Sequence, residues 1–326
     1  MSRVAEFDRF GGPEVLHIVE TPTVQPAAGE VTIRIEAFAV NPLDVMMRSG
    51  TSPAPVPLPH ARLGIEGTGV IDSVGSAVTG LEVGDPVIVA AIPDAAVRGS
   101  YAEYITLPAT WVIARPAALE IPQAAAIWVA YSTAYGALME VAGLRPGDRL
   151  LISGASGGVG RAAMQIAAQI GATPIAVTRN PAKTAELLAA GAATVIATET
   201  ADLVDAVCRG TGGTGADVTL DLVRGPGQRD LLNATRPGGK LVAAGFLDPR
   251  PTPRPADSAI TVIDYRGFDY LLDLAVVGRM AAFLDAGVRL GALLPAVGDL
   301  FAFDEIVEAH RRFEKGIRTG KVVVMI

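Results

Sequence analysis

A glycine-rich segment, GASGGVG at residues 154–160, carries the strongest chemical signal in the sequence. It follows a short apolar run at 150–153, and residues 161–170 then place their apolar side chains on one face of a helix. Glycines between a strand and a helix permit a sharp turn and bring backbone N–H groups against a pyrophosphate. A second apolar run ends at residue 178, about 20 residues further on, as a dinucleotide fingerprint requires. The segment therefore predicts a dinucleotide site.

The cofactor contacts are expected along this turn. We assign them to five consecutive residues: Ala155, Ser156, Gly157, Gly158 and Val159. Gly157 and Gly160 take the second and third glycine roles of G-x-G-x-x-G, whereas Gly154 or Ala155 stands at the first, so the match is imperfect. A structural turn in any α/β protein produces similar strings. The order of strand, turn, helix and strand favours the dinucleotide interpretation.

The residues after the second strand indicate which dinucleotide to expect. An acidic residue there binds the ribose hydroxyls of NAD, whereas a basic residue suits the 2′-phosphate of NADP. The sequence has Arg179 at this position with no acidic residue near it, and Lys183 follows four residues later. The alternative is a pair of solvated surface cations. We expect NADPH as the cofactor, bound through both side chains.

Composition excludes several classes of protein. The chain has 326 residues, of which 27 are basic and 34 acidic, and its net charge of −7 argues against a broad nucleic-acid or anionic membrane surface. No apolar run approaches the roughly 20 residues of a spanning helix, and the N-terminus lacks the apolar core of a signal peptide. We therefore expect a cytoplasmic protein that binds neither nucleic acid nor membrane.

The scarcity of metal-binding side chains predicts that no metal is bound. Cys208 is the single cysteine, which excludes an intramolecular disulfide and any zinc site built on several thiolates. His17, His60 and His310 are far apart along the chain and show no ligand spacing. His60 is interpreted as a surface residue, with a place at the substrate mouth as the alternative.

The elements that must position these residues change character along the chain. Residues 31–39, 68–74 and 86–91 read as short strands of a β-rich region, and the four prolines of 51–60 predict an ordered loop. Beyond about residue 121, strands alternate with helices, which predicts a doubly wound parallel sheet and an α/β fold. Its strands are expected at 150–153, 173–178, 194–197, 217–222 and 240–245. Helices are expected at 279–286 and 303–315, and a closing strand at 321–326 should pack on the N-terminal β region.

Several motifs resemble, in the same order, those of the zinc-independent medium-chain dehydrogenases/reductases of the quinone oxidoreductase branch. They include FGGPEVL at 10–16, GIEGTGVIDSVGSAVTGLEVGDPV at 64–87, GSYAEY at 99–104, AGLRPGDRLLISGASGGVG at 142–160 and GKVVV at 320–324. The resemblance covers essentially the whole chain. It implies a GroES-like catalytic domain at 1–121, completed by 271–326, and a Rossmann NADP-binding domain at 122–270. It also implies a homodimer and hydride transfer from NADPH to quinones or α,β-unsaturated carbonyl compounds.

The resemblance also implies roles for individual residues. Asn41 would lie near the nicotinamide, Asp44 would brace its loop, and Thr133 would contact the nicotinamide or its ribose. The backbone of Gly245, Phe246 and Leu247 would hold the carboxamide end, and Phe268 would approach the cofactor or a neighbouring subunit. The alternatives are plainer: Asn41 as a turn residue before Pro42, and Thr133 as a helix cap. Glu66 is interpreted as a structural carboxylate bound to backbone or arginine, and Tyr135 as a core aromatic.

The chain departs from metal-dependent relatives at the positions that bind zinc. Asn41 or a neighbour stands where they have a cysteine, and Ile65 stands where they have a histidine; the short stretch 92–104 replaces their structural cysteine lobe. Met46 and Ser52 stand where relatives carry tyrosines, so the proton source is left to solvent as the simplest hypothesis. The alternatives are an enoyl-thioester or polyketide-type enoyl reductase, and a weakly catalytic NADPH-binding structural or sensor protein.

Overall fold

The computed structural model describes residues 1–252, 259–316 and 320–326, and the chain divides into two compact units. Unit 1 comprises Met1–Val129, Leu271–Ala281 and Leu294–Ile326, and unit 2 comprises Ala130–Tyr270 and Ala282–Leu293. The domain boundaries expected from the sequence are 121/122 and 270/271. The first boundary lies later in the structure, after Val129. One continuous helix, α3 (Ile121–Tyr135), spans both the expected and the observed position.

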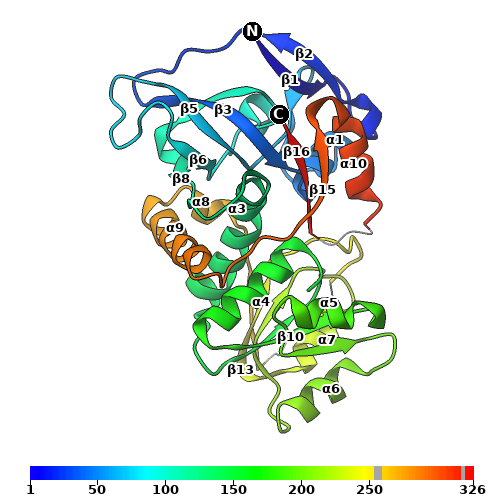
Figure 1. The fold of residues 1–326 in the computed structure, drawn as a ribbon. Coiled ribbons are helices and arrows are strands. Elements are labelled where there is room, and N and C mark those ends of the chain that lie inside the picture. Colours follow the sequence, from blue (N-terminus) through cyan, green and yellow to red (C-terminus); the bar gives the residue numbers. More distant parts are fainter. Residues whose placement is uncertain (253–258, 317–319) are drawn as a thin grey trace. The chain divides into compact units, whose positions relative to one another are not determined.

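The main sheet of unit 1 has the strand order β15-β16-β3-β5-β6-β8 in the described chain, and β7 also pairs with β3 (Figure 1). Its strands are β3 (Glu30–Ala39), β5 (Gly67–Val74), β6 (Pro86–Val89), β7 (Tyr104–Pro108), β8 (Val112–Ala114), β15 (Val297–Ala302) and β16 (Lys321–Met325). In β3, Val31, Ile33 and Ile35 are buried while Arg34 is exposed, the alternation expected of a half-buried strand.

The C-terminal strand joins the N-terminal β region, as predicted. β16 pairs antiparallel with β3, and Val323 lies opposite Ala39. This pairing places Lys321, at the start of β16, beside the end of β3 and the residues that follow it. Residues from the N-terminal and C-terminal parts of the chain therefore lie next to each other within unit 1.

A second sheet in unit 1 was not predicted. Its order is β2-β1-β4, from β1 (Ser2–Phe7), β2 (His17–Thr21) and β4 (Ala61–Arg62). The two pairings are antiparallel, and Glu6 of the central strand lies opposite His17 on one side and Arg62 on the other. These strands are short and carry charged residues, so neither length nor alternation identifies them in the sequence.

Unit 2 contains a parallel sheet whose order, among the described residues, is β11-β10-β9-β12-β13-β14. Its strands are β9 (Arg149–Ile152), β10 (Thr173–Thr178), β11 (Thr194–Ala197), β12 (Ala216–Asp221), β13 (Thr235–Ala243) and β14 (Thr261–Asp264). Successive strands run outward in both directions from the β9–β12 pair, which makes that pair the topological switch point of a doubly wound sheet. The predicted α/β class and the parallel sheet are confirmed.

Two details of this sheet differ from the prediction. β13 begins at Thr235 and ends at Ala243, earlier than the predicted 240–245, because the chain turns at Ala244 and Gly245 to donate both amides to the Asp221 carbonyl. β14 was not predicted, since its four residues are a short run without strong alternation.

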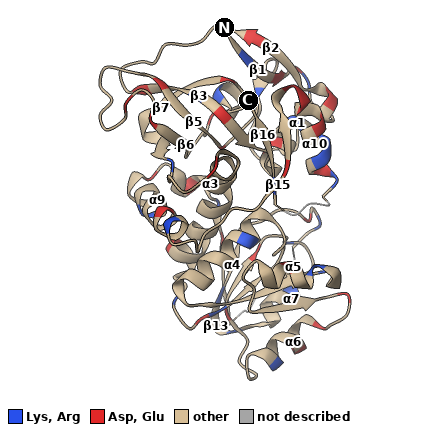
Figure 2. Cartoon of the chain, in the orientation of Figure 1, with Lys and Arg blue, Asp and Glu red and all other residues tan. Residues whose placement is uncertain are grey.

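The helices connect these strands. In chain order they are η1 (Pro13–Val15), α1 (Pro42–Ser49), α2 (Ala95–Arg98), η2 (Ala109–Trp111), α3, the π-helix η3 (Gly136–Ala142), α4 (Gly158–Ile170), η4 (Pro181–Lys183), α5 (Thr184–Ala189), α6 (Leu203–Gly210), α7 (Gln228–Asn233), α8 (Phe268–Leu271), α9 (Leu274–Arg289), η5 (Phe303–Glu305) and α10 (Ile306–Glu314). No helix in the described ranges is long and apolar enough to cross a membrane. Basic and acidic positions are interspersed along the ribbon in Figure 2.

Candidate functional site

The glycine-rich turn of unit 2 connects β9 to α4 at the switch point of the parallel sheet. Gly154 has a φ of +62°, a left-handed conformation that favours glycine, and Gly157 is the N-cap of α4. A Cβ on Gly160 would lie 2.6 Å from the Ala155 Cα, so only glycine lets the helix pack this closely against the turn. The first amides of α4 have no side-chain cap from Gly157 and suit an anionic group.

Lys183 belongs to this turn, although the sequence separates the two. Its Nζ donates to the Ser156 Oγ at 3.2 Å. The half-exposed Ser156 lies in the middle of the glycine turn, and Lys183 ends η4 after β10. Arg179 follows β10 directly and is exposed. The structure thus places one of the two predicted cations on the turn and the other at the end of the neighbouring strand.

A buried carboxylate joins the carboxyl ends of the two strands that flank the switch point. The Asp221 Oδ1 accepts from the Ser153 hydroxyl at 2.7 Å and from the amides of Val223 and Arg224, and its Oδ2 accepts from the Gln228 side chain. Four donors satisfy a carboxylate that has no exposed surface. Asp221 is not among the site residues expected from the sequence. It fixes β9 and β12 at the edge where the glycine turn begins.

The segment of Gly245, Phe246 and Leu247 is anchored by a side chain that sequence analysis also missed. A Cβ on Gly245 would collide with the Leu222 carbonyl. Arg224 donates from its Nε to the Gly245 carbonyl at 2.6 Å and from its guanidinium to the Ala243 carbonyl at 3.0 Å. Phe246 and Leu247 are 51% and 61% exposed in the described chain, so this fixed backbone presents two apolar side chains outward.

The remaining predicted residues of unit 2 lie on helices. Thr133 is inside α3, two residues before its end, which contradicts the alternative of a helix cap. A Cβ on Gly267 would lie 3.6 Å from the Thr133 Oγ1, so the hydroxyl lies near the turn that precedes Phe268. Phe268 begins α8 and is 39% exposed. Tyr135 is buried against Phe283, with ring centroids 5.1 Å apart, as predicted for a core aromatic.

In unit 1, Asn41 and Glu66 form a buried centre with Lys321. The Lys321 Nζ donates to the Asn41 Oδ1 and to the Glu66 Oε1, both at 2.5 Å. The Asn41 Nδ2 donates to the Glu66 Oε1 at 2.9 Å and to the Ala39 carbonyl at 3.1 Å. The Glu66 Oε2 accepts from the Val129 amide at 2.9 Å. Glu66 is therefore bound to backbone, as predicted, but its cationic partner is a lysine rather than an arginine.

Asp44 fixes the loop that carries Asn41. Its Oδ2 accepts from the Asn41 amide at 2.8 Å and its Oδ1 from the Gly64 amide at 2.9 Å. The residue has no exposed surface, and burial raises the pKa of its carboxyl to about 7, against the lowering effect of these two amides. The contact with Gly64 connects the start of α1 to the GIEGTG segment, which contains Glu66.

The side chains of this centre do not form a zinc ligand set. Zinc sites of this kind need thiolate or imidazole ligands, whereas this centre offers an amide, a carboxylate and an ammonium. Ile65 has no donor atom. The Lys321 ammonium already contacts the Asn41 Oδ1 and the Glu66 Oε1. Its positive charge opposes the binding of a second cation there.

Tyr101 is buried beside Gly64, where an added Cβ would lie 2.7 Å from its ring. Its hydroxyl is hydrogen-bonded to the His310 Nε2 at 3.1 Å, and its ring stacks on Phe38. Burial raises the pKa of Tyr101 well above its ordinary value and lowers that of His310 to about 3. The pair is therefore neutral at pH 7. Met46 and Ser52 bring no phenol, as the sequence already shows.

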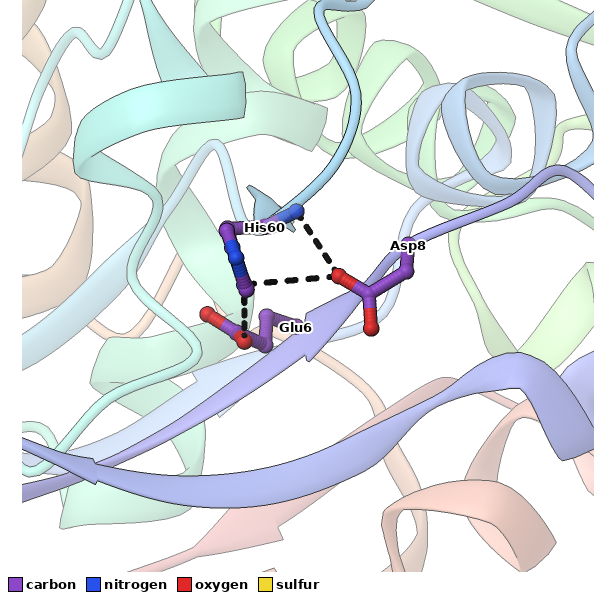
Figure 3. A group of neighbouring side chains, drawn as sticks. All are labelled: Glu6, Asp8 and His60. Carbon is purple, nitrogen blue, oxygen red and sulfur yellow. Dashed lines mark hydrogen bonds and ion pairs between the residues drawn. The ribbon is translucent and has the colours of Figure 1, made fainter.

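Two of the three histidines lie against the same pair of carboxylates in unit 1. The ring nitrogens of His17 and His60 both approach the carboxylates of Glu6 and Asp8 (Figure 3 shows Glu6, Asp8 and His60). The His60 side chain is 70% exposed, in agreement with its interpretation as a surface residue. The absence of a ligand spacing in the sequence did not anticipate this cluster, because antiparallel pairing brings its members together.

Two family models match the chain. One, described as an alcohol dehydrogenase GroES-like domain, matches residues 27–117, and the other, described as a zinc-binding dehydrogenase, matches residues 158–278. Human quinone oxidoreductase is 30% identical to the chain over 333 residues, an alignment that covers 100% of this chain and 98% of that protein.

Solved structures are similar over the same extent. Escherichia coli quinone oxidoreductase, in its complex with NADPH, has a TM-score of 0.89 and 26% identity, with 100% of both chains covered. The CurF ER cyclopropanase from the curacin A biosynthetic pathway has a TM-score of 0.86 and 26% identity, with 99% of both chains covered.

Proposed function

Because the chain belongs to the medium-chain dehydrogenase/reductase family, in its quinone oxidoreductase branch, we propose that it is an NADPH-dependent enzyme that reduces quinones or α,β-unsaturated carbonyl compounds without zinc. The observation that carries this proposal is the composition of the centre in unit 1. Asn41, Glu66 and Lys321 supply hydrogen bonds and one positive charge, but no ligand set for a Lewis-acidic metal.

The residues of unit 2 suit a nicotinamide dinucleotide. The amides of 155–159 and the start of α4 would bind the pyrophosphate, because Gly154 and Gly160 keep that turn free of side chains. Lys183, held on the turn through Ser156, and Arg179 would bind the 2′-phosphate of the adenosine ribose. When bound, NADPH supplies the hydride that the acceptor receives.

The centre in unit 1 would act on the charge that develops in the acceptor. Reduction of a quinone or an enone places negative charge on its carbonyl oxygen, and a fixed positive charge or donor near that oxygen lowers the barrier. Both Nδ2 hydrogens of Asn41 are already donated, so Asn41 orients its neighbours. Lys321 has three ammonium hydrogens, of which Asn41 and Glu66 accept two. We assign Lys321 the electrostatic role and Asn41 and Asp44 the positioning of the loop.

The other predicted contacts belong to the same proposal. Thr133 would contact the nicotinamide or its ribose, and the backbone of 245–247, fixed by Arg224, would hold the carboxamide. Phe268 would approach the cofactor or a neighbouring subunit. The proton that completes the reduction would come from solvent, since Met46 and Ser52 carry no phenol.

We further propose that the protein is a cytoplasmic homodimer with a small-molecule substrate. β14 has β13 as its one neighbour within the described sheet, so its outer edge is open to pairing with a second copy. Light scattering at several protein concentrations tests the dimer. A monomer throughout that range would contradict this part without affecting the proposed reaction.

The reaction is tested by the loss of NADPH absorbance with three acceptors in parallel: a quinone, a simple enone and an acyl thioester. The proposal expects turnover with the quinone or the enone. Turnover confined to the thioester would instead establish an enoyl-thioester reductase, an alternative favoured by the likeness to the CurF ER cyclopropanase. Tight NADPH binding without oxidation by any acceptor would indicate a structural or sensor protein. A chelator control that leaves turnover unchanged is expected for a zinc-independent enzyme.

A further inference from the structure

Four side chains with metal-binding atoms meet on the small sheet of unit 1, outside the residues assigned to the reaction. The His60 Nδ1 lies 2.8 Å from the Glu6 Oε1 and 3.4 Å from the Asp8 Oδ1. The His17 Nε2 lies 3.7 Å from the same Glu6 oxygen and 3.6 Å from the Asp8 Oδ2. In Figure 3 the Glu6, Asp8 and His60 side chains point toward one another.

The strand register explains why these residues converge. Side chains two residues apart on a strand share a face, which places Glu6 and Asp8 on one side of the central strand β1 and its extension. Glu6 is the register partner of His17 on β2. His60 immediately precedes β4 on the other side, and its amide donates to the Asp8 Oδ1 at 2.9 Å. One histidine from each flanking segment therefore faces two carboxylates on the central strand.

The distances suit a metal site for three of these side chains, because one ligand atom each from Glu6, Asp8 and His60 lies within 4.8 Å of the other two, a group that does not include His17. With metal–nitrogen and metal–oxygen bonds of about 2.0–2.2 Å, the ligand atoms of a tetrahedron lie about 3.3–3.6 Å apart. The His60–Asp8 separation of 3.4 Å matches this value, and the His60–Glu6 contact of 2.8 Å is a hydrogen bond whose proton a metal ion would displace. We propose that Glu6, Asp8 and His60 form a binding site for a divalent ion of the zinc type, with water in the fourth position and His17 beside the same two carboxylates.

The burial and charge of the cluster support the proposal. The Glu6 side chain is only 7% exposed and is directed at the two imidazoles, whereas the histidines are 41% and 70% exposed and open to an ion from solvent. Arg62, the other register partner of Glu6, brings one positive charge against two carboxylates. A divalent ion would leave the local charge positive by one, a modest cost for a site with two exposed members.

The donor set selects the class of ion. An imidazole with two carboxylates suits Zn²⁺ and its neighbours in the first transition row, whereas Mg²⁺ and Ca²⁺ prefer sites built from oxygen alone. An ion bound here would connect β1 and its extension to the end of the proline-rich loop 51–60. Its role would be to fix that loop on the sheet, separate from the Asn41–Glu66–Lys321 centre.

The test is a Zn²⁺ titration of the metal-free full-length protein against a chromophoric chelator, with Mg²⁺ as the comparison ion. The Cys208→Ser background removes the half-buried free thiol as a competing ligand. We expect one Zn²⁺ per chain, no Mg²⁺ binding, and an upward shift of Tm with Zn²⁺. His60→Asn should weaken Zn²⁺ binding by about ten- to a hundred-fold, and His17→Gln, which removes only a neighbour of the two carboxylates, by less. Asparagine is chosen at position 60 because it tolerates the φ of +64° found there.

Glu20→Gln is the matched control, since it removes an exposed carboxylate from the same strand β2 without touching the cluster. It should leave Zn²⁺ affinity unchanged. X-ray absorption of the bound ion should show nitrogen and oxygen neighbours with imidazole scattering. Failure of the folded parent to bind Zn²⁺, or equal affinity in the folded His17→Gln/His60→Asn double variant, would overturn the proposal. Neither readout depends on NADPH oxidation, so the result is independent of the proposed function.

Discussion

The glycine turn of unit 2 and the Asn41–Glu66–Lys321 centre of unit 1 are built in opposite ways. The turn is one continuous segment, and its backbone conformation is determined by glycines at 154 and 160. The centre gathers residues from the start of α1, the segment before β5 and the start of β16. A local segment can bind with its backbone alone. A centre assembled from distant residues depends on strand pairing to bring its charges together.

The largest effect is expected at Asp44, whose protonation makes the free energy of unfolding depend on pH. The pKa of its carboxyl is raised from 3.8 to about 7, so the folded state binds a proton that the unfolded state has released. This group therefore stabilises the fold most below pH 4, and its contribution falls by up to about 4 kcal/mol as pH rises to 7. Urea unfolding from pH 4 to 8 should show this decline, and Asp44→Asn should remove it. The exposed Asp72→Asn should retain it; an unchanged slope in Asp44→Asn would refute the assignment.

Removal of the lysine charge tests the centre itself. Lys321→Met should lower kcat/KM for the quinone or enone by about 10²- to 10³-fold, the loss expected when one donor to a developing oxyanion is removed. NADPH affinity, measured by fluorescence, should stay unchanged because Lys321 lies outside the glycine turn. Lys321→Arg keeps the charge with altered geometry and should recover part of the activity. Equal turnover in all three proteins would show that Lys321 is structural.

Substitution of Gly160 tests the glycine turn of unit 2. Gly160→Ala places a methyl group 2.6 Å from the Ala155 backbone, which should cost about 1–3 kcal/mol and weaken NADPH binding by about ten- to a hundred-fold. Gly210→Ala is the control, because a Cβ at that position, the last of α6, would meet no atom within 4 Å. Calorimetry and NADPH titration measure both effects. If Gly160→Ala binds NADPH as tightly as Gly210→Ala does, the close packing of the turn is not required.

Cofactor preference should change by a smaller factor. Lys183→Gln and Arg179→Gln should each lower the NADPH-to-NADH ratio of kcat/KM by about ten-fold, since a charge-assisted hydrogen bond contributes about 1.5–3 kcal/mol. Lys315→Gln, at an exposed position after α10, is the control. A preference that survives the double Arg179/Lys183 variant would mean that other residues read the 2′-phosphate.

Thr133→Ala should have the smallest effect if solvent supplies the proton. A loss of nicotinamide contact without loss of an acid–base group predicts a change of less than about ten-fold in kcat. A fall of about 10²-fold or more, with a change in the pH–rate profile, would instead identify the Thr133 hydroxyl as part of the proton path.

The sequence predicted most accurately where structure follows from neighbouring residues. The parallel strands of unit 2 and the alternating strand β3 are recognisable from apolar period, and the glycine turn from its position between a strand and a helix. β1 escaped prediction because charged residues interrupt its apolar pattern, and β4 and β14 escaped because each is too short to show a period. Asp221 and Arg224 escaped because their partners are backbone groups of other segments.

What the sequence alone determined is therefore the family-wide order of motifs, the glycine turn, the cations that follow β10, and the absence of a thiolate set. Only the tertiary structure decided that Lys321 joins Asn41 and Glu66, and that His17 and His60 face the same two carboxylates. The physical reason is the same in both cases. Antiparallel pairing sets which side chains face each other across strands, and that register depends on segments far apart in the chain.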